Sequence, residues 1–215
     1  MTTAKICGIN DTAAMEAALT GGASHVGLVF YPKSPRAVSP AEASEFSALA
    51  TGNAVRVGLF VDPDDAFLDQ VLAAVPLDLI QLHGGESAAR VAAIREATDI
   101  AVMKAISVAD AADIDRAQEY GDVADWLMFD AKPPKTLENA LPGGNAVAFD
   151  WSLLAGKTWP KPWMLAGGLT AENVGQAILE TGPDVVDISS GVEDQPGRKN
   201  PAKIKAFLAA VASAH

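Results

Sequence analysis

Eight short apolar segments recur along the 215 residues of this chain, and alanine-rich stretches with a helical period separate most of them. The segments are residues 4–9, 25–30, 55–61, 77–83, 100–106, 125–130, 163–168 and 184–189. Segments that are apolar on both faces are typical of strands buried in a parallel sheet. Eight such strand–helix units predict an α/β fold, a single (β/α)8 TIM barrel domain over residues 1–215.

The alternative fold is an open doubly wound sheet. Eight consecutive units without a second domain favour closure into a barrel instead. The sixth unit departs from the pattern, because residues 131–148 contain three prolines and two glycines and predict a long loop. A loop of this length in a compact domain is usually functional. We therefore expect seven of the eight strands to be followed by a helix.

Two helical stretches show their buried face in the sequence. Their apolar positions are Phe67, Leu68, Val71, Leu72 and Val75 in one, and Ile204, Phe207, Leu208 and Val211 in the other. This spacing places the side chains on one face of a helix. Ser39, followed by Pro40 and Glu42, predicts a capping box. Asn200 and Thr170 are predicted to cap two further helices.

Charge and composition exclude several classes of function. The chain has 27 acidic and 16 basic side chains, a net charge of −11, which repels nucleic acid and anionic lipid. No apolar run approaches the roughly 18 residues that a membrane span needs. The absence of a signal peptide and the single cysteine predict a cytoplasmic protein. His25, His83 and His215 lie far apart, so no zinc motif is visible, and no G-x-G-x-x-G fingerprint of a flavin or nucleotide site occurs.

Polar side chains stand at the carboxyl ends of four predicted strands, where catalytic residues of such a barrel lie. These residues are Cys7, Gln81 with His83, Asp130 and Asp187. Gln81 and His83 are two apart, so they share one face of their strand. Each residue alone could be structural, because a buried polar group needs only a partner. Four such strand ends on one side of the barrel indicate an active site.

Cys7 is the only cysteine, so it cannot form a disulfide within the chain. A free cysteine is commonly a small buried apolar side chain. The alternative is a reactive group, which its place at a strand end, directly before a glycine, allows.

Two glycine-containing stretches follow the last two predicted strands, LAGGLT at residues 165–170 and ISSGVE at residues 188–193. Glycine lets backbone N–H groups approach an anion closely, and the loops after these strands form the recurrent phosphate site of the fold. The residues predicted to bind phosphate are Gly167, Gly168, Ser190 and Gly191. Simple turn glycines are the alternative interpretation.

The loop after the second predicted strand reads YPKSPRA at residues 31–37. Its two prolines stiffen the loop, which presents Lys33 and Arg36. A guanidinium group suits a carboxylate ligand, and it can bind both oxygens. The alternative is an arginine solvated at the surface.

These motifs, in this order, resemble the phosphoribosylanthranilate isomerase family of tryptophan biosynthesis. The resemblance runs from residue 5 to about residue 199 and rests on KICGI, GLVFYPKSPR, VGLFV, IQLHG, FD, LPGG, FDWSLL, LAGGLTAENV and VDISSGVE. It implies the Amadori rearrangement of N-(5-phosphoribosyl)anthranilate to 1-(2-carboxyphenylamino)-1-deoxyribulose 5-phosphate, without cofactor or metal. The partner it implies is this phosphorylated small molecule, handled by a monomer or homodimer.

The resemblance also implies roles for the candidate residues. Asp130 is then the general acid, Cys7 the general base, and Arg36 the group that holds the anthranilate carboxylate. The phosphate ligands are Gly167, Gly168, Ser190 and Gly191; Asp187 contacts the sugar hydroxyls, and Gln81 and His83 line the mouth. A thiol acts as a base only as a thiolate, which a nearby cation favours. Lys5 shares a strand face with Cys7 but is deeper, so the sequence leaves that cation unassigned.

Other phosphosugar barrels are the competing interpretations. A ribulose-phosphate epimerase needs metal-binding histidines on several strands, and this chain has only His25 and His83 within its predicted strands. An indole-glycerol-phosphate synthase needs a lysine as general acid at a strand end. Lys104 lies within the fifth predicted strand, but the residues on either side of it do not match that family. A bifunctional isomerase carries two phosphate sites, and one is found. A non-catalytic phosphosugar-binding barrel remains, and turnover separates it from an enzyme.

Overall fold

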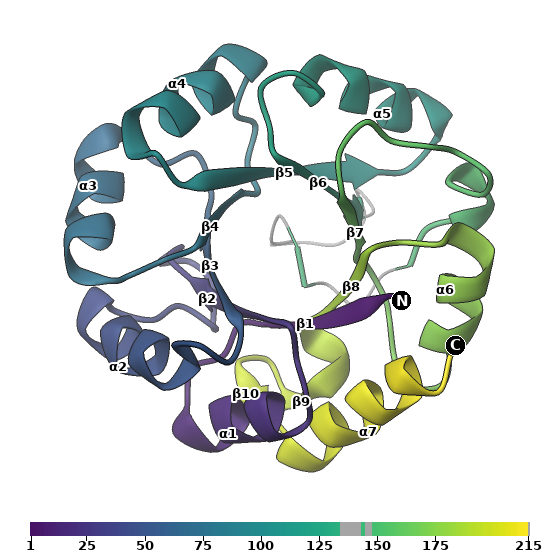
Figure 1. Ribbon diagram of the computed structural model, residues 1–215, viewed down its shortest axis with the longest axis horizontal. Helices are drawn as coiled ribbons and strands as arrows, with labels where there is room; N and C mark the ends of the chain where they lie inside the picture. Colours follow the sequence, from purple (N-terminus) through teal and green to yellow (C-terminus); the bar gives the residue numbers. More distant parts are fainter. Residues whose placement is uncertain (134–142, 145–147, 215) are drawn as a thin grey trace.

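The computed structural model describes residues 1–133, 143–144 and 148–214. Eight strands pair in parallel and close into a barrel in chain order, with β1 pairing β8. Figure 1 shows the strands as an inner ring and the helices as an outer one. The strands are β1 (Thr3–Cys7), β2 (His25–Val29), β3 (Val55–Phe60), β4 (Leu79–Leu82), β5 (Ala101–Val108), β6 (Trp126–Ala131), β7 (Trp163–Leu165) and β8 (Val185–Ile188). The predicted TIM barrel is confirmed, and each strand overlaps its predicted apolar segment.

Helices follow every strand except the sixth in the described part of the chain. They are α1 (Thr12–Thr20), α2 (Pro40–Ala50), α3 (Asp65–Ala74), α4 (Ala88–Thr98), α5 (Ala111–Asp115), α6 (Val174–Thr181) and α7 (Pro201–Ala212), with the 3-10 helices η1 (Arg116–Tyr120), η2 (Trp151–Leu153) and η3 (Ser190–Val192). Between β6 and β7 the described residues form only η2. The predicted loop at 131–148 lies largely outside the described residues, because 134–142 and 145–147 are not among them.

The predicted helix caps are correct at two positions and wrong at a third. Ser39 and Glu42 form the capping box at the start of α2, and Asn200 Oδ1 accepts from the backbone N–H of Lys203 over 3.2 Å at the start of α7. Thr170 does not cap α6, which begins four residues later at Val174. The backbone N–H of Thr170 instead donates to the side chain of Asn173, closing a turn before the helix.

A short antiparallel hairpin after β8 was not predicted. Its strands are β9 (Glu193–Gln195) and β10 (Arg198–Lys199). In Figure 1 it is drawn between α1 and α7, outside the ring of strands. The hairpin brings a buried glutamate and a buried lysine to the rim of the barrel, and both matter for the site described below.

The core has two parts, one between the strands and the helices and one inside the barrel. The inner part consists of Val57, Leu79, Met103, Ala105, Met128, Met164, Ala166 and Val185. The buried helix face of α7 is as predicted, and Phe207 on it has no exposed surface. A charged side chain, Lys5, is fully buried on the inward face of β1. Among the described helices, none has the length and apolarity to cross a membrane.

Candidate active site

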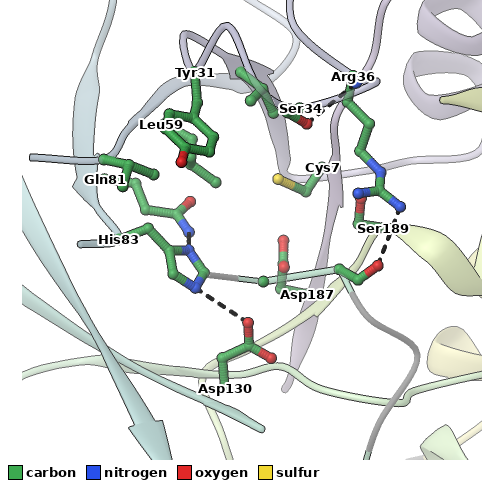
Figure 2. A pocket seen from close by; sticks show the side chains of 14 residues that line it. Cys7, Tyr31, Ser34, Arg36, Leu59, Gln81, His83, Asp130, Asp187 and Ser189 are labelled. Carbon is green, nitrogen blue, oxygen red and sulfur yellow. Dashed lines mark hydrogen bonds and ion pairs between the residues drawn. The ribbon is translucent and has the colours of Figure 1, made fainter. Parts of the chain in front are cut away.

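The polar strand ends converge on one pocket at the carboxyl end of the barrel (Figure 2). The pocket is lined by Cys7, Val29, Tyr31, Ser34, Arg36, Leu59, Val61, Gln81, His83, Asp130, Gly143, Gly144, Asp187 and Ser189. Every strand-end residue predicted from the sequence is part of this lining.

Cys7 is the last residue of β1, and it is buried with 4% of its surface exposed. Burial raises the pKa of the thiol above its ordinary value. The ammonium groups of Lys5 and Lys199 oppose this rise, whereas the carboxylate of Asp187 adds to it. The thiol is therefore the stable form at neutral pH, and its ionisation depends on the charges beside it.

Lys5 and Asp187 form an ion pair at the base of the pocket. They are register partners on the adjacent strands β1 and β8, and Lys5 Nζ donates to Asp187 Oδ1 over 2.7 Å. Their exposed fractions are 0% and 8%. A charge in such surroundings is tolerated because it is paired, so each side chain fixes the other.

Asp130 on β6 faces His83, which directly follows β4 (Figure 2). The His83 Nε2 and Asp130 Oδ2 atoms are 3.2 Å apart. The other oxygen of Asp130 accepts from the backbone N–H of Ala131 over 2.8 Å. His83 Nδ1 lies 2.9 Å from the amide nitrogen of Gln81. Because an amide nitrogen only donates, Nδ1 accepts, and the proton of a neutral ring lies on Nε2. Among the described residues Nε2 faces Asp130 without an aligned hydrogen bond.

Gly143 covers the contact between Asp130 and His83. A Cβ atom at this position would lie 2.7 Å from Asp130 Oδ2 and 2.9 Å from His83 Nε2. Real Cβ atoms do not come so close to other heavy atoms. Glycine is therefore required for the backbone to lie directly over the two side chains.

Arg36 is buried in the wall of the pocket with 5% of its surface exposed, so the interpretation as a solvated arginine is wrong. Its Nε and Nη2 donate to the two carboxylate oxygens of Glu193 over 2.8 and 2.9 Å. Nη2 also donates to the carbonyl oxygen of Gly144 over 3.2 Å. The sequence analysis assigned the bidentate edge of Arg36 to a ligand, but Glu193 occupies it. Within the described residues, the three hydrogen bonds of Arg36 come from Nε and Nη2 and none from Nη1.

Glu193 and Lys199 come from the hairpin and were missed by the sequence analysis as site residues. Lys199 Nζ donates to Glu193 Oε1 over 2.8 Å, and to the carbonyl and hydroxyl oxygens of Ser189 over 3.0 and 3.2 Å. Burial raises the pKa of Glu193, but its bonds to Arg36 and Lys199 outweigh that effect and hold the pKa below its usual value. The carboxylate therefore stays ionised and keeps Arg36 in place.

A second pocket adjoins the first and contains both predicted glycine loops. Its lining is Asp130, Ala131, Gly144, Ala166, Gly167, Gly168, Leu169, Asp187, Ile188, Ser189, Ser190 and Gly191. The backbone of Gly167 has φ +89° and that of Gly168 has φ +63°, values that glycine adopts without strain. A Cβ at Gly168 would lie 2.6 Å from the backbone nitrogen of Ala148. All four residues predicted to bind phosphate thus line one pocket.

The two pockets share Asp130, Gly144, Asp187 and Ser189. Asp130 therefore stands between the pocket that contains Cys7 and Arg36 and the pocket formed by the glycine loops. A ligand that fills both pockets lies next to the shared residues, this carboxylate among them.

The protein-family model described as "PRAI: N-(5'phosphoribosyl)anthranilate (PRA) isomerase" matches residues 4–210. The chain belongs to this family. The N-(5'-phosphoribosyl)anthranilate isomerase of Rhodospirillum centenum is 57% identical over 209 residues, which cover 97% of each chain. That of Paramagnetospirillum magneticum is 58% identical over 206 residues, which cover 96% of this chain and 95% of the relative.

Solved structures of the isomerase family have the same fold. The phosphoribosylanthranilate isomerase of Thermotoga maritima superposes with a TM-score of 0.87 and 36% identity, covering 99% of both chains. A phosphoribosylanthranilate isomerase in complex with reduced 1-(o-carboxyphenylamino)-1-deoxyribulose 5-phosphate has a TM-score of 0.82 and 34% identity, again covering 99% of both chains.

In this member of the isomerase family, the predicted site residues lie together in two adjoining pockets. Three further residues that were not predicted as site residues contact the residues that line these pockets: Lys5, Glu193 and Lys199. KICGI placed Lys5 on the same strand face as Cys7, so alternation along the strand was the signal for it. Glu193 ends the ISSGVE motif, but its partners depend on the fold of the hairpin. In the described part of the chain, no group of three or more His, Cys, Asp or Glu side chains could hold a metal ion.

Proposed function

We propose that this isomerase-family chain converts N-(5-phosphoribosyl)anthranilate to 1-(2-carboxyphenylamino)-1-deoxyribulose 5-phosphate by an Amadori rearrangement in tryptophan biosynthesis. Residues 1–215 act as one catalytic domain, and the single cysteine suits the reducing cytoplasm. The observation that carries the proposal is the placement of Asp130 and Cys7 in one pocket that adjoins two glycine loops.

The two pockets match the two ends of this substrate. The phosphate binds between the Gly167–Gly168 and Ser190–Gly191 loops, where the backbone comes close to the ligand. The anthranilate group occupies the other pocket, and its ring lies against apolar side chains such as Val29 and Leu59. The ribose then spans the shared part of the site, next to Asp187.

Arg36 binds the anthranilate carboxylate through its remaining N–H groups. Glu193 holds the Nε and Nη2 edge, and this contact orients the guanidinium. A guanidinium has five N–H donors in fixed directions. Among the described residues, two bonds to Glu193 and one to Gly144 use three of these donors, and the others are available for a ligand. Arginine is suited to this role because the charged, planar group matches a carboxylate.

The rearrangement needs one proton delivered and one removed. Asp130, as the general acid, protonates the ring oxygen of the ribose, and the C1–O bond breaks to give an iminium ion. Cys7, as the general base, takes the proton from C2, and the electron pair of that C–H bond forms the enolamine. Tautomerisation of the enolamine gives the ketone, so the reaction is a net isomerisation. Both groups act without cofactor or metal, as general acid–base catalysis requires only positioned side chains.

Loss of anthranilate fluorescence from freshly prepared N-(5-phosphoribosyl)anthranilate tests the proposal. We expect the wild-type protein to accelerate the decay, and Asp130→Asn to lose at least about a hundredfold of that rate, the lower range for a general acid. Decay that survives in Asp130→Asn would keep the isomerase activity and remove the acid role. No acceleration above the spontaneous rate would favour the alternative, a phosphosugar-binding barrel with another substrate or without turnover.

A further inference from the structure

The ammonium group of Lys5 lies beside the thiol of Cys7 inside the barrel. The two residues are two apart on β1 and point to the same inward face. A Cβ atom built on Gly27 of the neighbouring strand would lie 2.9 Å from Cys7 Sγ and 3.2 Å from Lys5 Nζ. Both atoms thus border the same small space, which Gly27 leaves open.

We propose that Lys5 is a positioning residue of this enzyme, whose buried ammonium stabilises the thiolate of Cys7 in competition with Asp187. The catalytic part of this inference rests on the proposed role of Cys7 as the base. The coupling between the two side chains does not depend on turnover, so it can be tested separately.

The hydrogen bonds of Lys5 leave it available to the thiolate. An ammonium group has three N–H donors. In the described part of the chain, the recorded hydrogen bond of Lys5 goes to Asp187 Oδ1 over 2.7 Å. Since Lys5 has no exposed surface, its other N–H groups face the interior, where Cys7 Sγ is next to it.

Lys199 is the other lysine near Cys7, but the hydrogen-bond donors of its ammonium group are occupied. Its ammonium donates to Glu193 Oε1 and to both oxygens of Ser189, over 2.8 to 3.2 Å. These three acceptors match its three N–H groups. Its positive charge still favours the thiolate at a distance, but the ion pair with Glu193 offsets that effect.

The remaining charges around Cys7 are paired or neutral. Arg36, whose Cδ lies against Gly8, is paired with Glu193. His25 on β2 faces Lys5, and burial together with the charge of Lys5 lowers the pKa of its imidazole to about 4. It is therefore neutral at pH 7. Asp187 on β8 raises the pKa of the thiol, and the charge of Lys5 is the largest effect that opposes this rise.

Because Cys7 is the only cysteine, its ionisation can be followed without interference. The protein is labelled with cysteine carrying ¹³C at Cβ, and the single resonance is titrated with pH by NMR. Removing an opposite charge a few ångströms away changes a pKa by about 1 to 3 units. In Lys5→Met, we expect the Cys7 midpoint to rise by at least about one unit.

Lys104→Met is the matched control. Lys104 is also a buried lysine, 3% exposed and ion-paired with Glu86 over 2.8 Å, but it is absent from the lining of the Cys7 pocket. We expect its titration to coincide with that of the wild type. Coincident titrations of Lys5→Met and the wild type would overturn the proposal.

A second pair of variants, Asp187→Asn and Lys5→Met/Asp187→Asn, decides the question if Lys5→Met, which leaves Asp187 buried without its partner, does not fold. Both lack the carboxylate that itself raises the pKa of the thiol, so a difference between their Cys7 midpoints is due to Lys5, and the double variant is expected to titrate at least about one unit higher. Coincident midpoints of the two variants would overturn the proposal.

Turnover then separates this inference from the proposed function. In Lys5→Met, kcat at neutral pH is expected to fall about tenfold for each unit of midpoint shift, and to recover toward alkaline pH. Displaced titrations in a protein that does not accelerate the rearrangement would leave the Lys5–Cys7 coupling intact and reject the isomerase activity.

Discussion

The Nε2 atom of His83 lies 3.2 Å from the Oδ2 atom of Asp130, and the two residues are 7% and 6% exposed. Gln81 holds the opposite side of the ring, with its amide nitrogen 2.9 Å from Nδ1. Its amide oxygen is buried and, within the described residues, has no partner. The three side chains form a line whose end is the proposed acid.

Replacing His83 is expected to lower kcat more than it raises KM. In His83→Asn, Asp130 loses the ring that lies against one of its oxygens, so its carboxyl group is less well oriented for its proposed role as the acid. We expect a loss of about tenfold to a hundredfold in kcat, measured by the fluorescence assay. Gln81→Leu keeps the imidazole ring but removes the hydrogen bond to Nδ1, so it is expected to have a smaller effect. A His83→Asn enzyme with wild-type kcat would show that the ring does not assist Asp130.

Replacing Glu193 is expected to raise KM with a smaller change in kcat. Glu193→Gln keeps the shape of the side chain but removes the charge that holds Arg36 through two hydrogen bonds. Arg36 would then hold its proposed ligand, the substrate carboxylate, in a less fixed orientation. Substrate binding is expected to weaken about tenfold, because a charged hydrogen bond contributes about 1.5 to 3 kcal/mol. Steady-state kinetics measure it.

Asp194→Asn is the control for Glu193→Gln. Asp194 is the next residue of the hairpin, but its carboxylate pairs with Lys203 and Asn200 away from the pocket. Its KM is expected to equal that of the wild type. Equal KM values for both variants and the wild type would mean that Glu193 does not orient Arg36 for binding.

Much of the barrel follows from local rules that the sequence shows directly. Apolar segments identified the strands, and alternation along β1 and β4 placed Cys7, Gln81 and His83 at the mouth. Thr170 was wrongly predicted to cap α6. A threonine that precedes a helical stretch fits the pattern of a helix cap, and it fits equally well when a turn separates the threonine from the helix. The side chain of Asn173 decides between the two.

The contacts between distant residues could not be predicted in this way. Arg36 and Glu193 are 157 positions apart, and Lys5 and Asp187 are 182 apart. Such pairs depend on barrel closure and on the hairpin after β8. The sequence indicated that Arg36 could bind a carboxylate, but not that a carboxylate of the chain itself would take its bidentate edge.

Gly168→Ala is expected to weaken substrate binding by displacing the proposed phosphate loop. Its φ of +63° strains any other residue, and a Cβ would lie 2.6 Å from the backbone nitrogen of Ala148. The loop must therefore move, and we expect KM to rise about tenfold or more, while inorganic phosphate inhibits less well. Kinetics with phosphate as a competitor measure both effects.

Gly182→Ala separates the effect of strain from that of the loop position. Gly182 has almost the same φ, +62°, at the end of α6, but a Cβ there meets nothing within 4 Å. It should lose stability, about 1 kcal/mol, and retain the wild-type KM. A Gly168→Ala enzyme that behaves like Gly182→Ala would argue against a phosphate site at this loop.

The stability of the fold should depend on pH through His25. Burial, and then the positive charge of Lys5, lower its pKa to about 4 in the folded protein, from 6.5. Because the depressed pKa belongs to the folded state, the contribution to stability is complete above pH 6.5. It is lost as the pH falls toward 4, since the unfolded chain takes up a proton that the folded protein does not. The free energy of unfolding then falls by about 1.4 kcal/mol per pH unit in this window.

His25→Gln isolates this contribution from that of the carboxylates, which titrate in the same range. The glutamine cannot take up the proton, so the variant should lack this part of the slope. Urea denaturation at pH 7 and at pH 4.5 gives the free energy of unfolding of both proteins. We expect the difference between the wild type and the variant to shift by roughly 2 to 3 kcal/mol in favour of the variant at the lower pH. A difference that is the same at both values would mean that His25 titrates normally in the folded state, and that Lys5 does not exert its charge on the interior of the barrel.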